Sequence, residues 1–124
     1  IELGNITSLT NLYLQNNRLT GNIPKEFSLL TSLFVLSLGN NKLSGEIPPE
    51  LTNLGNLVEM GLEENLLSGK IPVEFIEQFE FYPTFDISNN YFNEIEEELP
   101  EDWNTTNACQ IIPSLKSARS IYNK

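Results

Sequence analysis

A six-residue phrase that recurs at a fixed interval constrains the fold of this chain more than any other feature. The phrase reads LTGNIP at residues 19–24, LSGEIP at 43–48 and LSGKIP at 67–72, so each copy begins 24 residues after the last. Self-similarity at such a period is typical of solenoids, in which each repeat is one structural unit that buries its apolar face against its neighbours. The spacing therefore predicts a stack of similar coils.

The residues around the phrase follow the same interval. Each phrase comes after a segment with the pattern L-x-x-L-x-L, in which Leu12, Leu36 and Met60 occupy one shared column. Downstream the register slips by one residue and gives a fourth, weaker copy at 82–92. A single polar residue also recurs between the segment and the phrase. This asparagine column comprises Asn17, Asn41, Asn65 and Asn90.

Together the columns give L-x-x-L-x-L-x-x-N-x-L-S/T-G-x-I-P, which resembles the plant-type leucine-rich repeat of receptor-kinase ectodomains, polygalacturonase inhibitors and many algal proteins. The close match covers residues 1–92. The resemblance implies an α/β repeat solenoid, a right-handed leucine-rich-repeat superhelix with a short-stranded parallel sheet on its concave face and a convex side of 3-10 turns and irregular segments. We expect about four coils over 1–102, the last one degenerate, and a C-terminal closure over 103–124 that could include a short helix.

The chemistry of the columns is that of a scaffold. Side chains alternate along a strand, so Leu12 and Leu14 should point inward while Tyr13 points outward. An asparagine amide can pair with backbone groups in the bend after each strand, which an apolar side chain cannot do. Gly21 and its equivalents permit a positive φ or a close approach of coils, and the following Pro24 stiffens the return segment. Function is therefore expected from the outward positions that the repeat leaves free.

Those outward positions differ between copies and predict a binding face. Ser37, Gly39 and Gly61 would form a shallow trough between an apolar patch and an acidic end. This face suits a protein or peptide with a basic, partly apolar surface, and the alternative is an ordinary solvated sheet whose partner binds elsewhere. The predicted partner-binding residues are Tyr13, Phe34, Val35, Glu59, Glu63 and Asp86, with Glu64 beside them.

Composition argues against other classes of function. The formal net charge is -10, which should repel nucleic-acid phosphates. The chain has no histidine, so no His-based triad, general base or metal site can be built, and we expect no enzyme activity, metal or cofactor. The acidic run EIEEELPED at 94–102 could bind calcium, but it lacks a loop template for a hard cation, which favours a solvated insertion. The sequence contains no apolar run long enough to predict a membrane span.

The sequence leaves two alternatives each for the cellular location of the protein and for the redox state of its cysteine. Sequons at Asn5 and Asn104 could accept glycan, which favours a secreted protein or the extracellular face of a membrane over an organellar or intracellular assembly subunit. Cys109, the single cysteine, is expected to be a free buried thiol, with a disulfide to another segment or chain as the alternative.

The leading functional hypothesis is a non-catalytic binding module that uses the concave face. The alternatives are a structural or accessory subunit docked in a larger assembly, and the ectodomain fragment of a receptor-like kinase. The first coil carries no polar cap, so we expect its core edge to be exposed in isolation.

Overall fold

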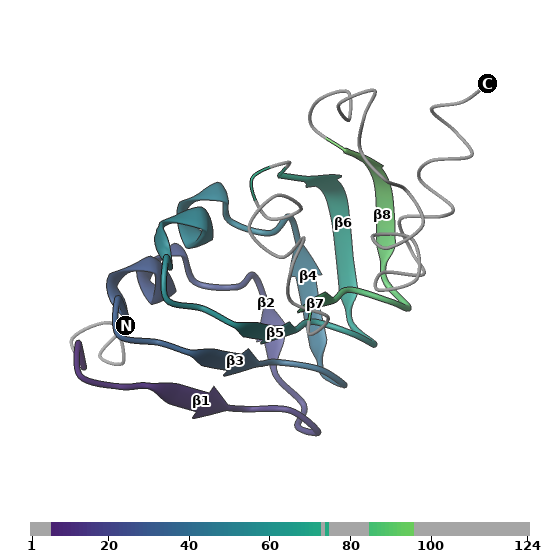
Figure 1. Ribbon diagram of the computed structural model, residues 1–124. Helices are drawn as coiled ribbons and strands as arrows, with labels where there is room; N and C mark the ends of the chain where they lie inside the picture. Colours follow the sequence, from purple (N-terminus) through teal and green to yellow (C-terminus); the bar gives the residue numbers. More distant parts are fainter. Residues whose placement is uncertain (1–5, 73, 75–84, 96–124) are drawn as a thin grey trace.

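The computed structural model describes residues 6–72, 74 and 85–95, which form a stack of coils with two parallel sheets (Figure 1). The first sheet has the order β1-β3-β5-β7, with one strand from each coil. Leu36 pairs with Leu12 on one side and with Met60 on the other, so residues 24 apart in sequence become neighbours. The repeat interval thus sets the register of the sheet. The strands are β1 (Asn11–Tyr13), β3 (Val35–Ser37), β5 (Glu59–Gly61) and β7 (Phe85–Asp86).

The recurring phrase builds a second parallel sheet, in a region that was expected from the sequence to be irregular. Its order is β2-β4-β6-β8, and it lies on the right of Figure 1. In the middle of this sheet Leu67 and Ile71 are buried while Lys70 is exposed, so the extended phrase feeds its apolar residues into the core. The strands are β2 (Thr20–Gly21), β4 (Lys42–Gly45), β6 (Leu66–Ile71) and β8 (Tyr91–Ile95).

The return segments contain 3-10 helices, as the resemblance implied. Helix η2 (Lys25–Leu29) follows Pro24 and η3 (Pro49–Asn53) follows Pro48, and both prolines are extended, with φ of -65° and -60°. Phe27 and Leu51 are the buried residues of the two helices. The two helices lie side by side in Figure 1.

The glycine of the phrase adopts a backbone conformation that other residues rarely take. Gly21, Gly45 and Gly69 all have φ of 81°, in the left-handed region. At Gly45 the surroundings are also tight, because a Cβ there would lie 2.5 Å from Asn22 Oδ1 of the preceding coil. Both reasons that the sequence suggests for a glycine here therefore apply. The positive φ occurs in all three copies, and the close approach of the preceding coil occurs at Gly45 and Gly69.

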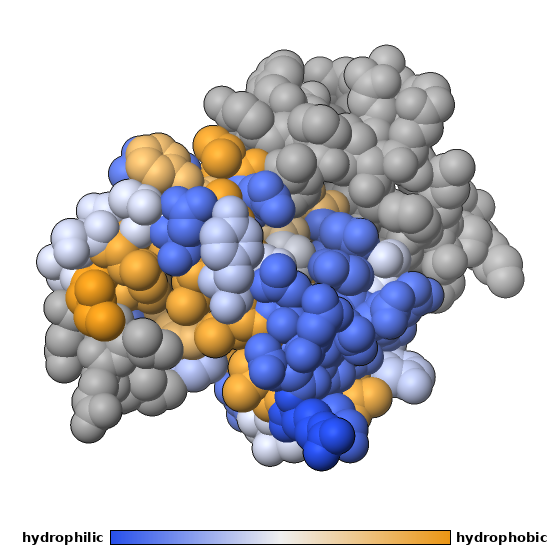
Figure 2. Space-filling view, turned by 90° about the horizontal axis from the view of Figure 1, so that it is seen from below, coloured by the Kyte–Doolittle hydropathy of each residue, from blue (hydrophilic) through white to orange (hydrophobic). Residues whose placement is uncertain are grey.

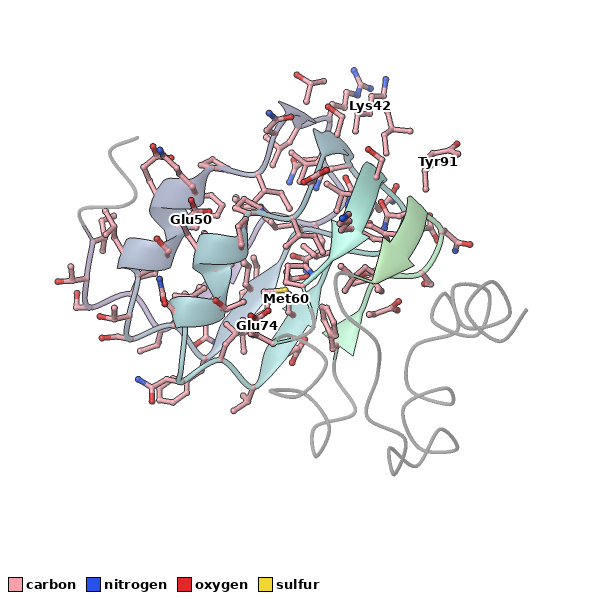
Figure 3. The ribbon with its side chains drawn as sticks, turned by 90° about the horizontal axis from the view of Figure 1, so that it is seen from above. Lys42, Glu50, Met60, Glu74 and Tyr91 are labelled. Carbon is pink, nitrogen blue, oxygen red and sulfur yellow. The ribbon has the colours of Figure 1, made fainter. Side chains whose placement is uncertain are left out.

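The hydrophobic core runs along the stack between the sheets and the 3-10 helices. One continuous cluster of buried side chains extends from Leu12 to Ile87. Met60, in the third strand of the first sheet, has no exposed surface and lies inside the ribbon in Figure 3. Each coil therefore completes its core only by contact with its neighbours, as a repeat architecture requires.

Asparagine side chains connect successive coils at the bend between the two sheets. Asn41 is buried, and its Oδ1 accepts a hydrogen bond from the backbone N–H of Leu19 in the preceding coil at 3.1 Å. Its Nδ2 donates to the carbonyl oxygens of Leu14 and Leu38, both at 3.0 Å. One side chain thus satisfies backbone groups of two coils.

The same bridge recurs further along the stack. Asn90 Oδ1 accepts from the N–H of Leu67 at 3.0 Å, and its Nδ2 donates to the carbonyl of Leu62 at 2.9 Å. Asn17, at the first bend, is exposed and donates to the nearby carbonyls of Leu14 and Gln15. The bridging asparagines therefore form a ladder through the stack, and Asn17 stands at its exposed end.

Several expectations fall outside the residues that the structure describes. They are both sequons, at Asn5 and Asn104, the thiol of Cys109, the acidic run beyond Ile95 and the proposed closure over 103–124. Within the described ranges, no helix has the length and apolar character needed to cross a bilayer.

Candidate functional site

The outward side of the first sheet, here called the first-sheet face, carries the predicted binding residues. Its aromatic members are well exposed, Tyr13 to 57% and Phe34 to 47%. Asn11 Nδ2 donates to the Tyr13 hydroxyl at 3.1 Å, which orients the ring along β1.

The sequence predicts that Tyr13, Val35 and Phe34 form one apolar patch, but the structure does not bring them together as one exposed surface. Val35 is only 9% exposed, because it stands in the middle of the sheet with Asn11 and Glu59 in register on either side. Phe34 donates its N–H to Thr10 at 2.7 Å, which places it three residues before Tyr13, or about 10 Å along the strand direction. Phe34 instead neighbours Val58, whose N–H donates to the Phe34 carbonyl at 2.9 Å. The two aromatic residues are therefore separate anchors.

A glycine trough, formed by Gly39 and Gly61, crosses the centre of the first-sheet face. The side chain of Glu63 lies over it, since a Cβ at Gly39 would collide with the Glu63 carboxyl group. A Cβ at Gly61 would come within 2.9 Å of Glu63 Oε2. The glycines at these positions make room for the Glu63 side chain, and the trough is already occupied by a carboxylate of the same chain.

The acidic residues of the face gather around this carboxylate. Burial raises the pKa of Glu63 above its ordinary value, and the negative charges of Asp86, Glu64 and Glu59 raise it further, while a hydrogen bond from its own backbone works in the opposite direction. All the neighbouring charges that act on Glu63 are therefore negative.

Asp86, Glu59 and Glu64 differ from Glu63 in their hydrogen bonds or in their exposure to solvent. Asp86 Oδ1 accepts hydrogen bonds from the Ser88 N–H at 2.9 Å and from the Ser88 hydroxyl at 2.6 Å. Glu59 and Glu64 are exposed to solvent, and Glu64 occupies the bend with a φ of 54°. Glu63 is thus the one acid in the group whose carboxylate is drawn down onto the sheet.

Two buried side-chain oxygens on this face have no hydrogen-bond partner, Glu63 Oε2 and Gln15 Oε1. Gln15, Gly39 and Glu63 occupy equivalent positions in three successive coils, since they are spaced by 24 residues. Unpaired acceptors of this kind are uncommon in folded proteins. Gln15 belongs to the outward column of the sequence but was not among the predicted binding residues, because a glutamine gives no signal of its pairing in sequence alone.

The second sheet carries a surface that the sequence did not predict. Near its strands lie two exposed basic residues, Arg18 and Lys42, and two exposed apolar ones, Leu66 at 48% and Tyr91 at 67%. They are not neighbours across the sheet, because Lys42 pairs with Thr20 and Leu66 pairs with Ser44. Figure 3 shows Lys42 and Tyr91 projecting from this side of the molecule. These residues all stand immediately after the asparagine column, a position that the repeat does not constrain.

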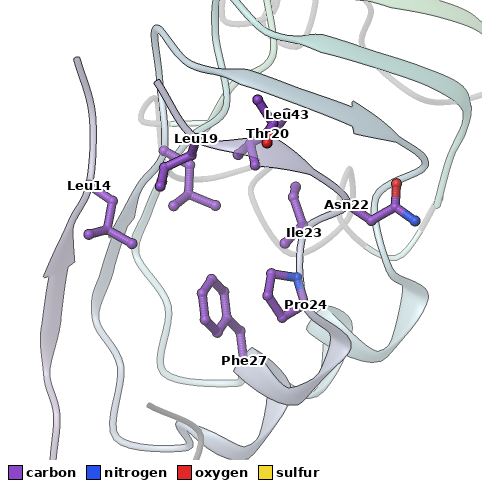
Figure 4. A pocket seen from close by; sticks show the side chains of 9 residues that line it. Leu14, Leu19, Thr20, Asn22, Ile23, Pro24, Phe27 and Leu43 are labelled. Carbon is purple, nitrogen blue, oxygen red and sulfur yellow. The ribbon is translucent and has the colours of Figure 1, made fainter. Parts of the chain in front are cut away.

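An apolar pocket of about 200 Å³ opens at the β1 end of the stack, between the two sheets (Figure 4). Leu14, Phe27 and Leu38 line it from the inner side, and Leu19 borders it with 38% of its surface exposed. Figure 2, which views the molecule from below, shows apolar surface on its left and strongly polar surface on its right.

The described residues offer little for metal chemistry. No group of three or more potential His, Cys, Asp or Glu ligands comes together in that part of the chain.

Two parallel sheets with one strand each per coil, 3-10 returns and an asparagine at every bend define a solenoid of leucine-rich repeats. The model of the leucine-rich repeat family matches residues 7–75, and the chain belongs to this family. No curated protein sequence matches it at a significant level.

Solved structures of plant receptor ectodomains are similar to this chain. The BIR2 ectodomain of Arabidopsis thaliana is 41% identical with a TM-score of 0.69, and the SOBIR1 ectodomain from the same plant is 30% identical with a TM-score of 0.66. Each match covers 75% of this chain, which spans 49% of the BIR2 structure and 50% of the SOBIR1 structure. The Arabidopsis receptor kinase HAESA, solved with the peptide hormone IDA and the co-receptor SERK1, is 36% identical with a TM-score of 0.69, over 75% of this chain and 15% of HAESA.

Proposed function

We propose that this chain is a non-catalytic module that binds a protein or peptide through the first-sheet face. The observation that carries the proposal is the acidic group of Glu59, Glu63 and Asp86, which comes from β5, the bend after it and β7. The fold does not need these charges, because the outward positions vary between coils while the inward ones repeat. Residues that cost stability without serving the scaffold are candidates for recognition.

The partner that fits this face has a basic and partly apolar surface. The acidic group would attract positive charge, and the exposed rings of Tyr13 and Phe34 provide separate anchors for apolar groups. Aromatic residues of this kind often dominate binding energy at protein interfaces.

The similar structures support this class of function and suggest a location. HAESA was solved with a peptide hormone and a co-receptor, and BIR2 and SOBIR1 are receptor ectodomains. By analogy, we place this chain in the extracellular part of a receptor-like protein. The sequence has no histidine with which to build the commonest general base, in keeping with a binding role.

Selection from a random peptide library tests the proposal. Peptides that bind the wild-type protein should be enriched in Lys or Arg together with apolar residues. Their binding should weaken in Tyr13→Ala and in a Glu59→Gln, Glu63→Gln, Asp86→Asn triple variant. A matched control on the second sheet, Lys42→Gln with Tyr91→Ser, should leave it intact. If the second-sheet changes abolish binding and the first-sheet changes do not, recognition lies on the other surface.

The apolar end of the stack favours a second candidate role, that of an accessory subunit docked end-on in a larger assembly. The pocket at the β1 end and the half-exposed Leu19 would suit contact with another repeat coil. Light scattering over a concentration series tests this role. Self-association that Leu19→Glu removes would support it, and a monomer at all concentrations would count against docking to a second copy.

A further inference from the structure

We propose that the β1 end of the stack receives one further leucine-rich-repeat coil, which belongs to the same polypeptide and leads into Ile6. The β1 end is separate from the acidic group of the first-sheet face, so the two proposals can be tested independently. The residues at this end repeat, column by column, the residues that join the internal coils to one another.

The apolar side chains at the β1 end belong to columns that are buried further along the stack. Leu19, Leu43 and Leu67 occupy one column, and their exposed fractions are 38%, 5% and 0%. Leu14 and Phe27 line the same pocket as Leu19, which opens at this end (Figure 4). The column that the later coils bury is therefore open in the first one.

Asn17 already has the conformation that bridges two coils at the later bends. Its Nδ2 donates to carbonyls of its own coil, at Leu14 and Gln15, and Asn41 makes the same two bonds within its coil. In addition, Asn41 accepts through Oδ1 the N–H of Leu19 in the preceding coil. Among the described residues no donor pairs with Asn17 Oδ1, so this atom is positioned to accept the N–H of a further coil.

The glycine of the first phrase borders a space that a side chain of the preceding coil fills at the next two phrases. A Cβ at Gly45 would lie 2.5 Å from Asn22 Oδ1, and a Cβ at Gly69 would lie 2.5 Å from Glu46 Cγ. A Cβ at Gly21 would meet nothing within 4 Å, although all three glycines have the same φ of 81°. The first phrase thus has the backbone shape that accommodates a preceding coil.

The chain enters the first described coil through the turn that also links the later coils. The N–H of Leu9 donates to the carbonyl of Ile6 at 3.1 Å, and the N–H of Leu33 donates to the carbonyl of Leu30 at 3.0 Å. Leu30 is buried, whereas Ile6, in the same column, is 44% exposed. Ile6 therefore stands where a coil ends. This favours a covalently linked coil, because a docked second copy would have to share this side of the stack with the entering chain.

A coil at this end would extend the first sheet. In parallel stacking its strand pairs with β1, as β3 does on the other side, so Tyr13 would stand inside the first-sheet face. A partner that contacts Tyr13 would then also contact the added strand.

Extended chains test the junction. One carries a copy of residues 25–48 joined before Ile1, which preserves the 24-residue interval, and a second carries a copy of residues 49–72 instead. The second copy guards against a defect of one added sequence. Each extended chain should unfold at a temperature about 5 °C or more above that of the 124-residue chain, because it gains one coil interface.

Asn17→Ala then separates stacking in register from a general effect of length. This change should raise the equilibrium constant for unfolding less than about threefold in the 124-residue chain and about tenfold or more in the extended chains. Asn41→Ala, at an internal bend, is the control and should have the same effect in all of them. If neither extended chain gains stability, or if Asn17→Ala has the same small effect in both, the inference is wrong.

Light scattering over a concentration series tests the other occupant. The 124-residue chain should stay monomeric. Self-association that Leu19→Glu removes would assign the β1 end to a second copy and would overturn the inference. None of these measurements depends on the acidic group, so their failure would leave the proposed binding function unaffected.

Discussion

Asn65 in one coil holds Leu43 of the preceding coil, because its side-chain Oδ1 accepts the Leu43 N–H at 3.0 Å. The amide nitrogen of the same side chain donates to the carbonyl of Leu38, also in the preceding coil, at 3.0 Å. The bridge is buried, with Asn65 only 4% exposed. Neighbouring coils are therefore joined by directional contacts as well as by apolar packing, and the bend cannot shift without leaving buried backbone groups unpaired.

Asn41→Ala should lower the free energy of unfolding by about 1–3 kcal/mol, because it leaves buried backbone groups without partners. The wild-type side chain bonds to Leu19 in the preceding coil and to Leu38 in its own. Urea unfolding of the variant measures the loss. Asn17→Ala is the matched control, since Asn17 is exposed and bonds to nearby carbonyls, and it should cost much less. Equal losses in the two variants would contradict the bridging role.

A series of glycine-to-alanine variants should separate backbone strain from crowding. Gly55→Ala should be nearly neutral, because a Cβ there meets nothing within 4 Å. Gly21→Ala should cost about 1–2 kcal/mol, since its φ of 81° is unfavourable for alanine while the space around it is open. Gly45→Ala should cost more than Gly21→Ala, because it adds a clash with Asn22. Thermal unfolding ranks the three, and any other order would contradict these two causes.

The sequence predicts the scaffold well because each column has one physical reason that repeats in every coil. Leu36 and Met60 must fill the same inward position, and Asn41 and Asn65 must satisfy the same bend. The second sheet was missed because the phrase contains a glycine and ends in proline, which usually indicate a bend. In the structure Gly69 adopts a positive φ within β6, and the strand continues through it to Ile71.

Glu63→Gln should raise stability at pH 7 and change it little at pH values below about 4.5. The folded state raises the pKa of Glu63 above its ordinary value of 4.5, first through burial and then through the charges of Asp86, Glu64 and Glu59. The folded state therefore binds the Glu63 proton more tightly than the unfolded state does. The resulting stabilisation is complete below pH 4.5 and is lost as the pH rises through the raised pKa.

Unfolding temperatures of the wild type and Glu63→Gln across this pH range test the prediction. Glu50→Gln serves as the control, because Glu50 is exposed on η3 and loses the same charge. If the unfolding temperature at pH 7 rises equally in both variants, the rise reflects net charge alone and contradicts a specific effect of burying Glu63.

The candidate site is less predictable than the scaffold, because outward positions obey no repeating rule. The sequence places Glu59, Glu63 and Asp86 on one face, and in the structure the charges of the other two act on Glu63. It cannot show that Val35 is covered by its neighbours, since a central strand position and an edge position look alike in sequence. Nor can it show that Glu63 lies over Gly39, because this depends on the side-chain conformation of a residue in another coil.

Removing the acidic group should slow association with a basic partner at low ionic strength. In the Glu59→Gln, Glu63→Gln, Asp86→Asn variant, the amide introduced at position 86 keeps an oxygen that can accept from Ser88, so the fold should be retained. The charges lie close enough to act on one another, so their fields add at the surface of the face. Such charges change the association rate more than the dissociation rate, and the effect should shrink with added salt, since the screening length near 0.15 M is about 8 Å.

The control for this experiment removes three acids from the rest of the surface, as Glu26→Gln, Glu50→Gln and Glu74→Gln, so that both variants gain the same net charge. Glu26 and Glu50 belong to the 3-10 helices, and Glu74 follows the end of β6. Stopped-flow association with a lysine- or arginine-rich peptide selected on the wild type should be slowed about tenfold or more by the first triple change in low salt, and much less by the control. Because net charge is equal, a difference between them can only come from where the charges lie. Identical rates for the two variants at every salt concentration would mean that the acidic group does not steer the partner.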